Sequence, residues 1–94
     1  MELYIILVYD IVTDEMGKKI LPKVFKTCKK YLTHIQNSVF EGELSESQLM
    51  KLRIEIRKYI RDDKDSIIVF QSRSNKWLNK EFWGMEDNKM SHFI

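Results

Sequence analysis

The chain has 94 residues, of which 44% are hydrophobic and 12% aromatic, and its formal net charge of +2 does not by itself argue for nucleic acid. This composition suffices for one compact domain, but so small a domain buries a modest share of its surface and often gains by self-association. The single cysteine, Cys28, excludes an intramolecular disulfide, and with two distant histidines it makes no zinc motif.

The N-terminal apolar run is too short to span a bilayer, and it follows Glu2 rather than the basic segment of a signal peptide. We therefore expect an unprocessed, cytoplasmic protein that has no contact with membranes. A reducing compartment also fits the cysteine count.

The first predicted element is a strand that ends at Asp10. The seven residues from Leu3 to Tyr9 include no charge or amide, which is typical of a strand covered on both faces. A helix follows, because residues 20–32 place apolar side chains at steps of three and four. Pro22 is tolerated only in the first turn, so the sequence predicts that this helix begins between residues 18 and 21.

Residues 34–44 alternate as a half-buried strand does, and Gly42 predicts either one bent strand or two short strands that turn about Glu41 and Gly42. Ser45 and Gln48 have the pattern of a capping box, which opens a second amphipathic helix. The charged run 61–65 ends this helix, and residues 66–70 predict a last core strand.

The element order βαββαβ predicts an α+β, ferredoxin-like sandwich over residues 1–72, with two helices on one face of an antiparallel sheet. Residues 73–94 form a polar tail that still holds Trp77, Phe82, Trp83 and Phe93. Aromatic side chains outside the elements of a domain suggest docking onto a partner subunit.

Asp10 is the first candidate site residue, because it stands where the apolar strand leaves the core. One alternative is a plain strand-end acid that accepts hydrogen bonds from the following turn. A single carboxylate does not hold Mg²⁺ strongly, but in a two-fold dimer a residue near the axis meets its own copy. Two facing carboxylates recruit a cation, so a shared Mg²⁺ is expected if the dimer forms.

A second candidate is a basic helix face, because no acid occurs between residues 16 and 33. Its lysines follow one side of the predicted helix, opposite the apolar stripe: Lys19, Lys23, Lys26 and Lys30. A lysine face kept for solubility and a phosphate-binding stripe explain this pattern about equally well. Cys28, on the apolar stripe, is expected in the core, and His34 and His92 belong to no ligand spacing.

Three stretches together resemble the CRISPR-associated protein 2 family: VYDI at 8–11, KKYL at 29–32 after a lysine-rich helix, and QNSVFEGEL at 36–44. The resemblance covers residues 3 to about 70. It implies a ferredoxin-like homodimer that works in spacer acquisition beside an integrase, CRISPR-associated protein 1, and that cleaves RNA or DNA with a metal ion.

By position, the resemblance implies that Asp10 binds Mg²⁺ across the dimer and that Tyr9 and Phe40 flank this catalytic site, with Ser38 as a weaker candidate. It implies phosphate contacts at Lys18 and Lys19, where many members have arginine; lysine keeps the charge but loses bidentate geometry. The tail near residues 90–94 is expected to add a strand to the sheet of the partner protomer.

These observations predict a homodimer that binds duplex DNA and bridges integrase subunits, with a metal-dependent endonuclease capacity. Two alternatives stay open. A single-stranded RNA reader of the RRM type shares the element order, but this chain lacks the aromatic signature on the third strand. A toxin-like ribonuclease of the virulence-associated protein D type is similar in fold and in its early acid.

Overall fold

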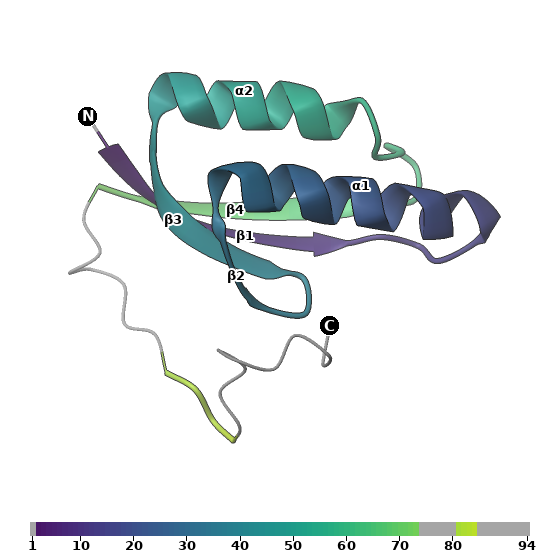
Figure 1. Ribbon diagram of the computed structural model, residues 1–94, viewed down its shortest axis with the longest axis horizontal. Coiled ribbons are helices and arrows are strands. Elements are labelled where there is room, and N and C mark those ends of the chain that lie inside the picture. Colours follow the sequence, from purple (N-terminus) through teal and green to yellow (C-terminus); the bar gives the residue numbers. More distant parts are fainter. Residues whose placement is uncertain (1, 74–80, 85–94) are drawn as a thin grey trace.

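The structure is a computed structural model of the chain, and it describes residues 2–73 and 81–84. Its elements follow in the order β1 (Glu2–Asp10), α1 (Glu15–Tyr31), β2 (Thr33–Gln36), β3 (Val39–Ser45), α2 (Glu46–Arg57) and β4 (Ser66–Ser72). The four strands form one antiparallel sheet in the order β2-β3-β1-β4, and both helices cover the same face of it (Figure 1). This arrangement confirms the predicted ferredoxin-like fold.

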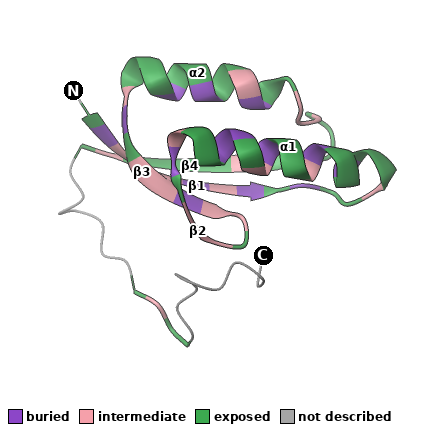
Figure 2. Cartoon of the chain, viewed as in Figure 1, coloured by how far each residue is buried: buried purple, intermediate pink, exposed green. Residues whose placement is uncertain are grey.

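Side chains along β1 alternate between the two faces of the sheet. Leu3, Ile5, Leu7 and Tyr9 are buried beneath the helices, while the residues between them are only half-buried (Figure 2). The prediction that both faces of this strand are covered holds only in part for the described residues, because on the second face Phe82 and Trp83 line a pocket with Ile6. With both helices on one side, the other side, which we call the open face, keeps its apolar side chains outside the core.

Helix α1 begins at Glu15, so the predicted start between residues 18 and 21 is wrong. The Asp14 side chain caps the helix by accepting a hydrogen bond from the backbone N–H of Gly17 at 2.8 Å. Pro22 then lies inside the helix, where its missing N–H leaves the Lys18 carbonyl without its usual partner. Both residues are exposed, so water can satisfy that carbonyl.

The segment around Gly42 divides into two strands, but the turn lies at Asn37 and Ser38 rather than at Glu41 and Gly42. Asn37 has a positive φ of 43°, which asparagine tolerates better than most residues. Gly42 lies inside β3, where an added Cβ would come within 3.1 Å of Leu32 in the core. Close packing, not a bend, therefore explains this glycine.

Helix α2 opens with the predicted capping box. The Gln48 N–H donates to Ser45 Oγ at 3.2 Å, and the Ser45 N–H donates to Gln48 Oε1 at 2.9 Å. The helix buries Leu49, Leu52 and Ile56 against the sheet.

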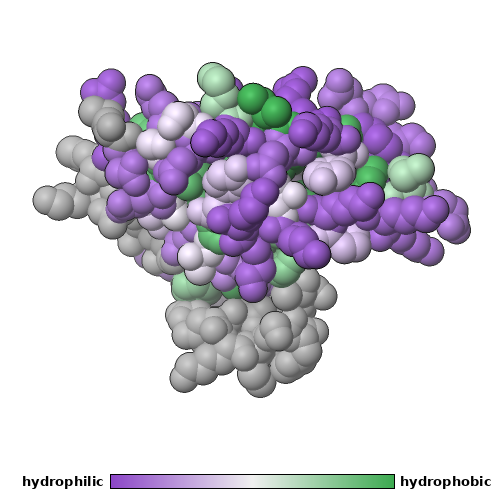
Figure 3. Space-filling view, turned by 45° about the horizontal axis from the view of Figure 1, so that its top comes forward, coloured by the Kyte–Doolittle hydropathy of each residue, from purple (hydrophilic) through white to green (hydrophobic). Residues whose placement is uncertain are grey.

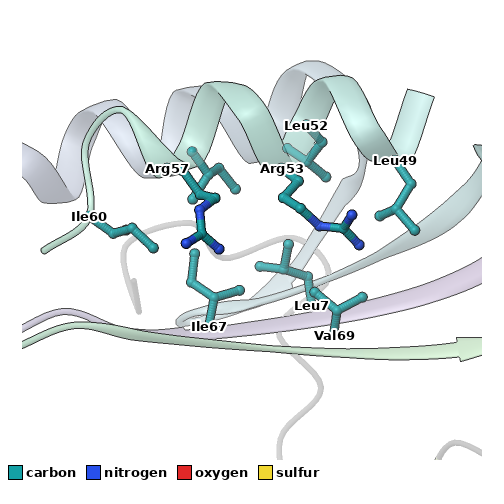
Figure 4. A pocket seen from close by; sticks show the side chains of 9 residues that line it. Leu7, Leu49, Leu52, Arg53, Arg57, Ile60, Ile67 and Val69 are labelled. Carbon is teal, nitrogen blue, oxygen red and sulfur yellow. The ribbon is translucent and has the colours of Figure 1, made fainter. Parts of the chain in front are cut away.

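Strand β4, predicted as a core strand, is an edge strand with most of its residues exposed (Figure 2). Only its inward-facing Ile67 packs against the core. Between α2 and this strand remains an apolar crevice of about 170 Å³, toward which Arg53 and Arg57 extend (Figure 4). Their aliphatic stems shield the inner side of an edge that no other element covers in the described part of the chain.

Candidate functional site

Asp10 is the last residue of β1 and lies opposite Ser66 of β4. Alternation along the strand places it on the open face, together with Ile6 and Val8. Its carboxylate is exposed and has no hydrogen-bond or ion-pair partner within residues 2–73 and 81–84. The structure therefore gives no support to a plain strand-end acid that is engaged by the following turn.

The backbone just beyond Asp10 is held on both sides by the connection between α2 and β4. The Val12 N–H donates to Asp65 Oδ1 at 3.0 Å, and Arg61 Nη2 donates to the Val12 carbonyl at 2.9 Å. Gly17 packs against the same carbonyl so closely that an added Cβ would lie 1.7 Å from its oxygen. This clamp fixes where the chain leaves β1 and therefore where Asp10 stands.

Arg61 links two carboxylates in this clamp. Its guanidinium donates to Asp14 at 2.7 and 2.8 Å and to Asp65 at 3.0 Å. Hydrogen bonds from Arg61 hold the pKa of Asp65 at about 2, and they hold the pKa of Asp14 well below its usual range, with help from the Gly17 N–H. The Asp14 carboxylate is therefore held by Arg61 and the helix cap, and it is not available as a second metal-binding carboxylate beside Asp10.

Sequence reasoning missed the clamp because the run from residue 61 to 65 has the composition of a surface helix terminus. Only the contacts across the fold, 47 or more residues apart in sequence, show what Arg61 and Asp65 bind. No local pattern in the sequence signals these pairs.

Tyr9 and Phe40, the predicted catalytic neighbours of Asp10, lie on the other face of the sheet. Both are buried, and their rings are stacked with centroids 6.0 Å apart. Burial raises the pKa of Tyr9 to about 12, so its hydroxyl stays protonated at neutral pH. The structure does not bring either side chain beside the Asp10 carboxylate, and Ser38 lies in the turn between β2 and β3.

All five predicted phosphate-binding lysines of α1 are exposed, and hydrophilic side chains dominate the helical face of the molecule in Figure 3. They are not equivalent. The ammonium of Lys30 already forms an ion pair with Glu55 of α2, and Lys23 lies 5.7 Å from the ring centroid of Tyr59. Lys18, Lys19 and Lys26 have no carboxylate partner among the described residues.

The described residues include no group of three histidine, cysteine, aspartate or glutamate side chains that could hold a metal ion. Asp10 alone supplies one carboxylate, whereas Mg²⁺ requires several oxygen ligands, most of which can be water. One copy of the chain therefore supplies a single carboxylate at Asp10, and a second carboxylate would add to the oxygen ligands of a Mg²⁺ ion bound there.

Comparison with known proteins assigns the chain to a protein family. The model of the family described as CRISPR associated protein Cas2 matches residues 1–80. This chain belongs to the Cas2 family. The resemblance seen in the sequence is thus confirmed, and the match argues against both the RNA-reading module and the toxin-like ribonuclease. Neither helix of residues 2–73 combines the length and apolar character needed to cross a bilayer.

Curated Cas2 relatives cover nearly the whole chain. A protein of Fusobacterium nucleatum named CRISPR-associated endoribonuclease Cas2 is 50% identical over 93 residues, which are 99% of this chain and 88% of the relative. A Thermotoga maritima protein of the same name is 38% identical over 84 residues, 89% of this chain and 91% of the relative. These names agree with the prediction of a nuclease.

Solved structures support the same assignment. A crystal structure of Cas2 superposes with a TM-score of 0.80 at 32% identity, covering 94% of this chain and 93% of the other. Streptococcus pyogenes Cas2 gives a TM-score of 0.73 at 24% identity, covering 85% and 99%, and this likeness concerns the fold alone.

Proposed function

We propose that the chain is the Cas2 subunit of a CRISPR adaptation system and acts as a homodimer with a Mg²⁺-dependent endonuclease capacity. The observation that carries the proposal is the position of Asp10, an exposed carboxylate without a partner in the described structure, at the end of an open apolar sheet face. The names of the curated relatives support cleavage of RNA, and DNA is the second candidate substrate.

The open face supports the dimer. Ile68 and Phe70 of β4 are each 54% exposed, and the strand register places them beside Val8 and Ile6 on the same face as Asp10. A contiguous apolar patch on a sheet is unusual for a monomer. Packing two copies face to face about a two-fold axis would bury it, because an isologous interface joins the same patch of both subunits.

The dimer supplies what one chain lacks for metal binding. If the axis passes near the end of β1, Asp10 of each copy faces its counterpart, and a Mg²⁺ ion relieves the repulsion between the two carboxylates. When bound, the ion supplies a water of lowered pKa and neutralises charge on the phosphate. Lys18 and Lys19, in the second turn of α1, are exposed cations that can hold the flanking phosphates.

The same dimer suits an architectural role, which we propose as the physiological one. Exposed lysines on α1 of two copies would form an extended basic surface that binds duplex DNA by its phosphates. The dimer would bridge subunits of the integrase, CRISPR-associated protein 1, in the cytoplasm. Residues 90–94, proposed to add a strand to the partner's sheet, lie outside the described residues.

Cleavage by pure protein tests the nuclease proposal. Labelled single-stranded RNA and duplex DNA are incubated with Mg²⁺, with EDTA, and with the variants Asp10→Ala and Asp63→Asn. Asp63 is exposed in the turn after α2 and serves as a matched surface acid. We expect EDTA and Asp10→Ala to lower the cleavage rate about 100-fold or more. Loss of the metal ion removes the group that activates the attacking water and neutralises charge on the phosphate. An equal rate in wild type and Asp10→Ala would contradict the proposal.

The ranking of the two roles has its own test. Spacer acquisition and assembly with the integrase are measured for Asp10→Ala. Acquisition that persists supports bridging as the physiological role. Acquisition that disappears while assembly is intact would show that the carboxylate, and not the scaffold alone, is needed.

A further inference from the structure

A groove on the helix side of the sheet is lined by residues of α1 and of the turn that joins β2 to β3. Both of these segments can be followed in Figure 1. Its volume of about 730 Å³ is within the range of sites that hold small organic ligands. Its apolar wall is made by Leu21, Pro22 and Phe25. Because the groove lies on the helix side, the proposed packing of open faces does not cover it.

The lysines that line this groove are not the same set as the lysines of the predicted phosphate-binding stripe. Lys18, Lys26 and Lys29 line it, no acidic residue does, and none of the three has a carboxylate partner in the described part of the chain. The Lys29 ammonium lies 5.9 Å from the ring centroid of Phe25. The groove thus combines an aromatic surface with unneutralised positive charge, which favours a ligand that is both flat and anionic.

The opposite wall presents a polar side chain on a fixed turn. His34 Nε2 donates to the Asn37 carbonyl at 2.8 Å, and the Tyr9 N–H donates to the Ser38 carbonyl at 3.2 Å. These bonds hold the backbone of the turn, while the exposed Asn37 amide has no partner among the described residues. A side-chain amide offers two donors and an acceptor, as the edge of a nucleobase requires.

We propose that this groove binds unpaired nucleotides of a single-stranded nucleic acid. The base lies against Phe25, its edge meets the Asn37 amide, and the phosphates contact Lys18, Lys26 and Lys29. A base within a duplex is covered by its neighbours and cannot reach Phe25. An acidic peptide side chain would match the lysines but has no flat apolar face.

The inference rests on the proposed function, because it assigns a substrate subsite to the same enzyme. Tyr9 lines the groove from the core side, and Asp10, the next residue of β1, lies on the open face, so the groove and the proposed metal site are on opposite faces of the sheet. A strand held in the groove would reach the proposed metal site only by passing around the edge of the sheet where β1 ends and β3 begins.

Binding without cleavage tests the groove. Fluorescence anisotropy is measured for the full chain with labelled octauridylate in EDTA, and with the same strand paired to its complement. The variants are Phe25→Leu, Phe25→Tyr and Lys29→Gln, with Lys51→Gln as the control. Lys51 is an exposed lysine of α2 outside the groove and outside the predicted stripe.

Stacking on an aromatic ring predicts that Phe25→Leu weakens binding of the single strand about fivefold or more, while Phe25→Tyr stays within about twofold. Lys29→Gln, which removes one phosphate contact, is expected to weaken it about threefold, and Lys51→Gln to have little effect. Phe25 packs against Phe40, so urea unfolding checks the stability of Phe25→Leu; Lys29→Gln changes only an exposed side chain.

Photocrosslinking with 5-iodouridine in the octamer gives a second readout, and we expect it to label the peptides of residues 18–29 and 37–38. Parent-like affinity in both Phe25→Leu and Lys29→Gln would overturn the proposal, as would crosslinks confined to other peptides. So would NMR shifts of the Phe25 and Asn37 amides that a glutamate hexamer produces and octauridylate does not.

The two proposals fail separately in this design. Asp10→Asn should bind octauridylate in EDTA as the parent does, because Asp10 is not part of the groove. If Asp10→Asn still cleaves RNA with Mg²⁺ while the groove variants lose binding, the proposed function is wrong and the groove stands. If the groove variants bind normally and Asp10→Asn loses cleavage, the reverse holds.

Discussion

Tyr9 and Asp10 are consecutive in β1, and their side chains lie on opposite faces of the sheet. Tyr9 is 5% exposed and stacks on Phe40 in the core, whereas Asp10 is exposed on the open face. The alternation of a strand makes this separation obligatory, because successive residues of a β-strand point in opposite directions. Two neighbours in one sequence motif therefore have different tasks: one packs the end of the strand, and the other is available to a ligand.

Tyr9→Phe tests this division. Burial raises the pKa of Tyr9 to about 12, so the hydroxyl keeps its proton near neutral pH, and alternation along β1 places the side chain on the core face. We expect Tyr9→Phe to keep the cleavage rate within about threefold and to leave its dependence on pH between 6 and 9 unchanged, since a general acid or base contributes about 100-fold or more. A loss as large as that of Asp10→Asn, measured under the same conditions, would restore Tyr9 as a catalytic residue.

Asp65→Asn is expected to destabilise the fold. The Asp65 side chain is buried and receives the Val12 N–H and three N–H donors of Arg61. Asp65→Asn removes one of the two carboxylates that pair with the Arg61 guanidinium and leaves only Asp14. We expect this to lower the free energy of unfolding by about 2–4 kcal/mol. Urea denaturation measures this cost, and Asp62→Asn, which changes an exposed acid of the same turn, is the control.

The same residue predicts a direction for the effect of pH. Its pKa in the folded state, about 2, lies below the ordinary value of 3.8, so its contribution to stability is complete above that ordinary value. It is lost as the pH falls from about 4 to about 2, because the unfolded chain then binds a proton that the folded chain resists. Wild type should therefore lose stability over this range more steeply than Asp65→Asn; parallel curves would contradict the assignment.

Local patterns predicted the elements of the fold well, and long-range contacts explain the errors. Alternation, helical spacing and the Ser45 capping box are short-range signals, and each produced the correct type of element. The predicted start of α1 is too late because proline is usually confined to the first turn of a helix, whereas Pro22 lies inside this one. The Asp14 side chain accepts a hydrogen bond from the Gly17 N–H and is held by Arg61, which lies far along the sequence. This cap starts the helix earlier and outweighs the preference of the proline.

The candidate site was only partly predictable for the same reason. Asp10 stands out locally as an acid at the end of an apolar run, and the family resemblance singles it out too. The open face of β1 exists because both helices pack on the other side of the sheet. The sequence of the strand does not show on which side the helices pack. Pairing of Lys30 with Glu55 likewise joins two helices and separates one lysine from the rest of the predicted stripe.

Lys26→Gln and Lys30→Gln should differ in their effects on binding of duplex DNA. Each released counterion contributes to the slope of log affinity against log salt, so loss of a phosphate contact lowers that slope by about 0.9. We expect this change for Lys26→Gln, whose ammonium is unpaired in the described structure, and a smaller one for Lys30→Gln, whose ammonium pairs with Glu55. Glu55→Gln should strengthen binding by freeing Lys30; equal slopes for both lysine variants would contradict this.

The open face predicts the oligomeric state, and two isoleucines give a matched comparison. Ile68 of β4 and Ile54 of α2 are each 54% exposed, but only Ile68 lies on the open face with Ile6 and Val8. Ile68→Glu places a charge inside the proposed two-fold interface beside its own copy, whereas Ile54→Glu adds the same charge to the helical side. Sedimentation equilibrium should find Ile68→Glu monomeric and Ile54→Glu dimeric. If cleavage needs two Asp10 carboxylates, the monomer also loses activity although its own Asp10 is intact; a fully active monomer would remove the shared metal from the proposal.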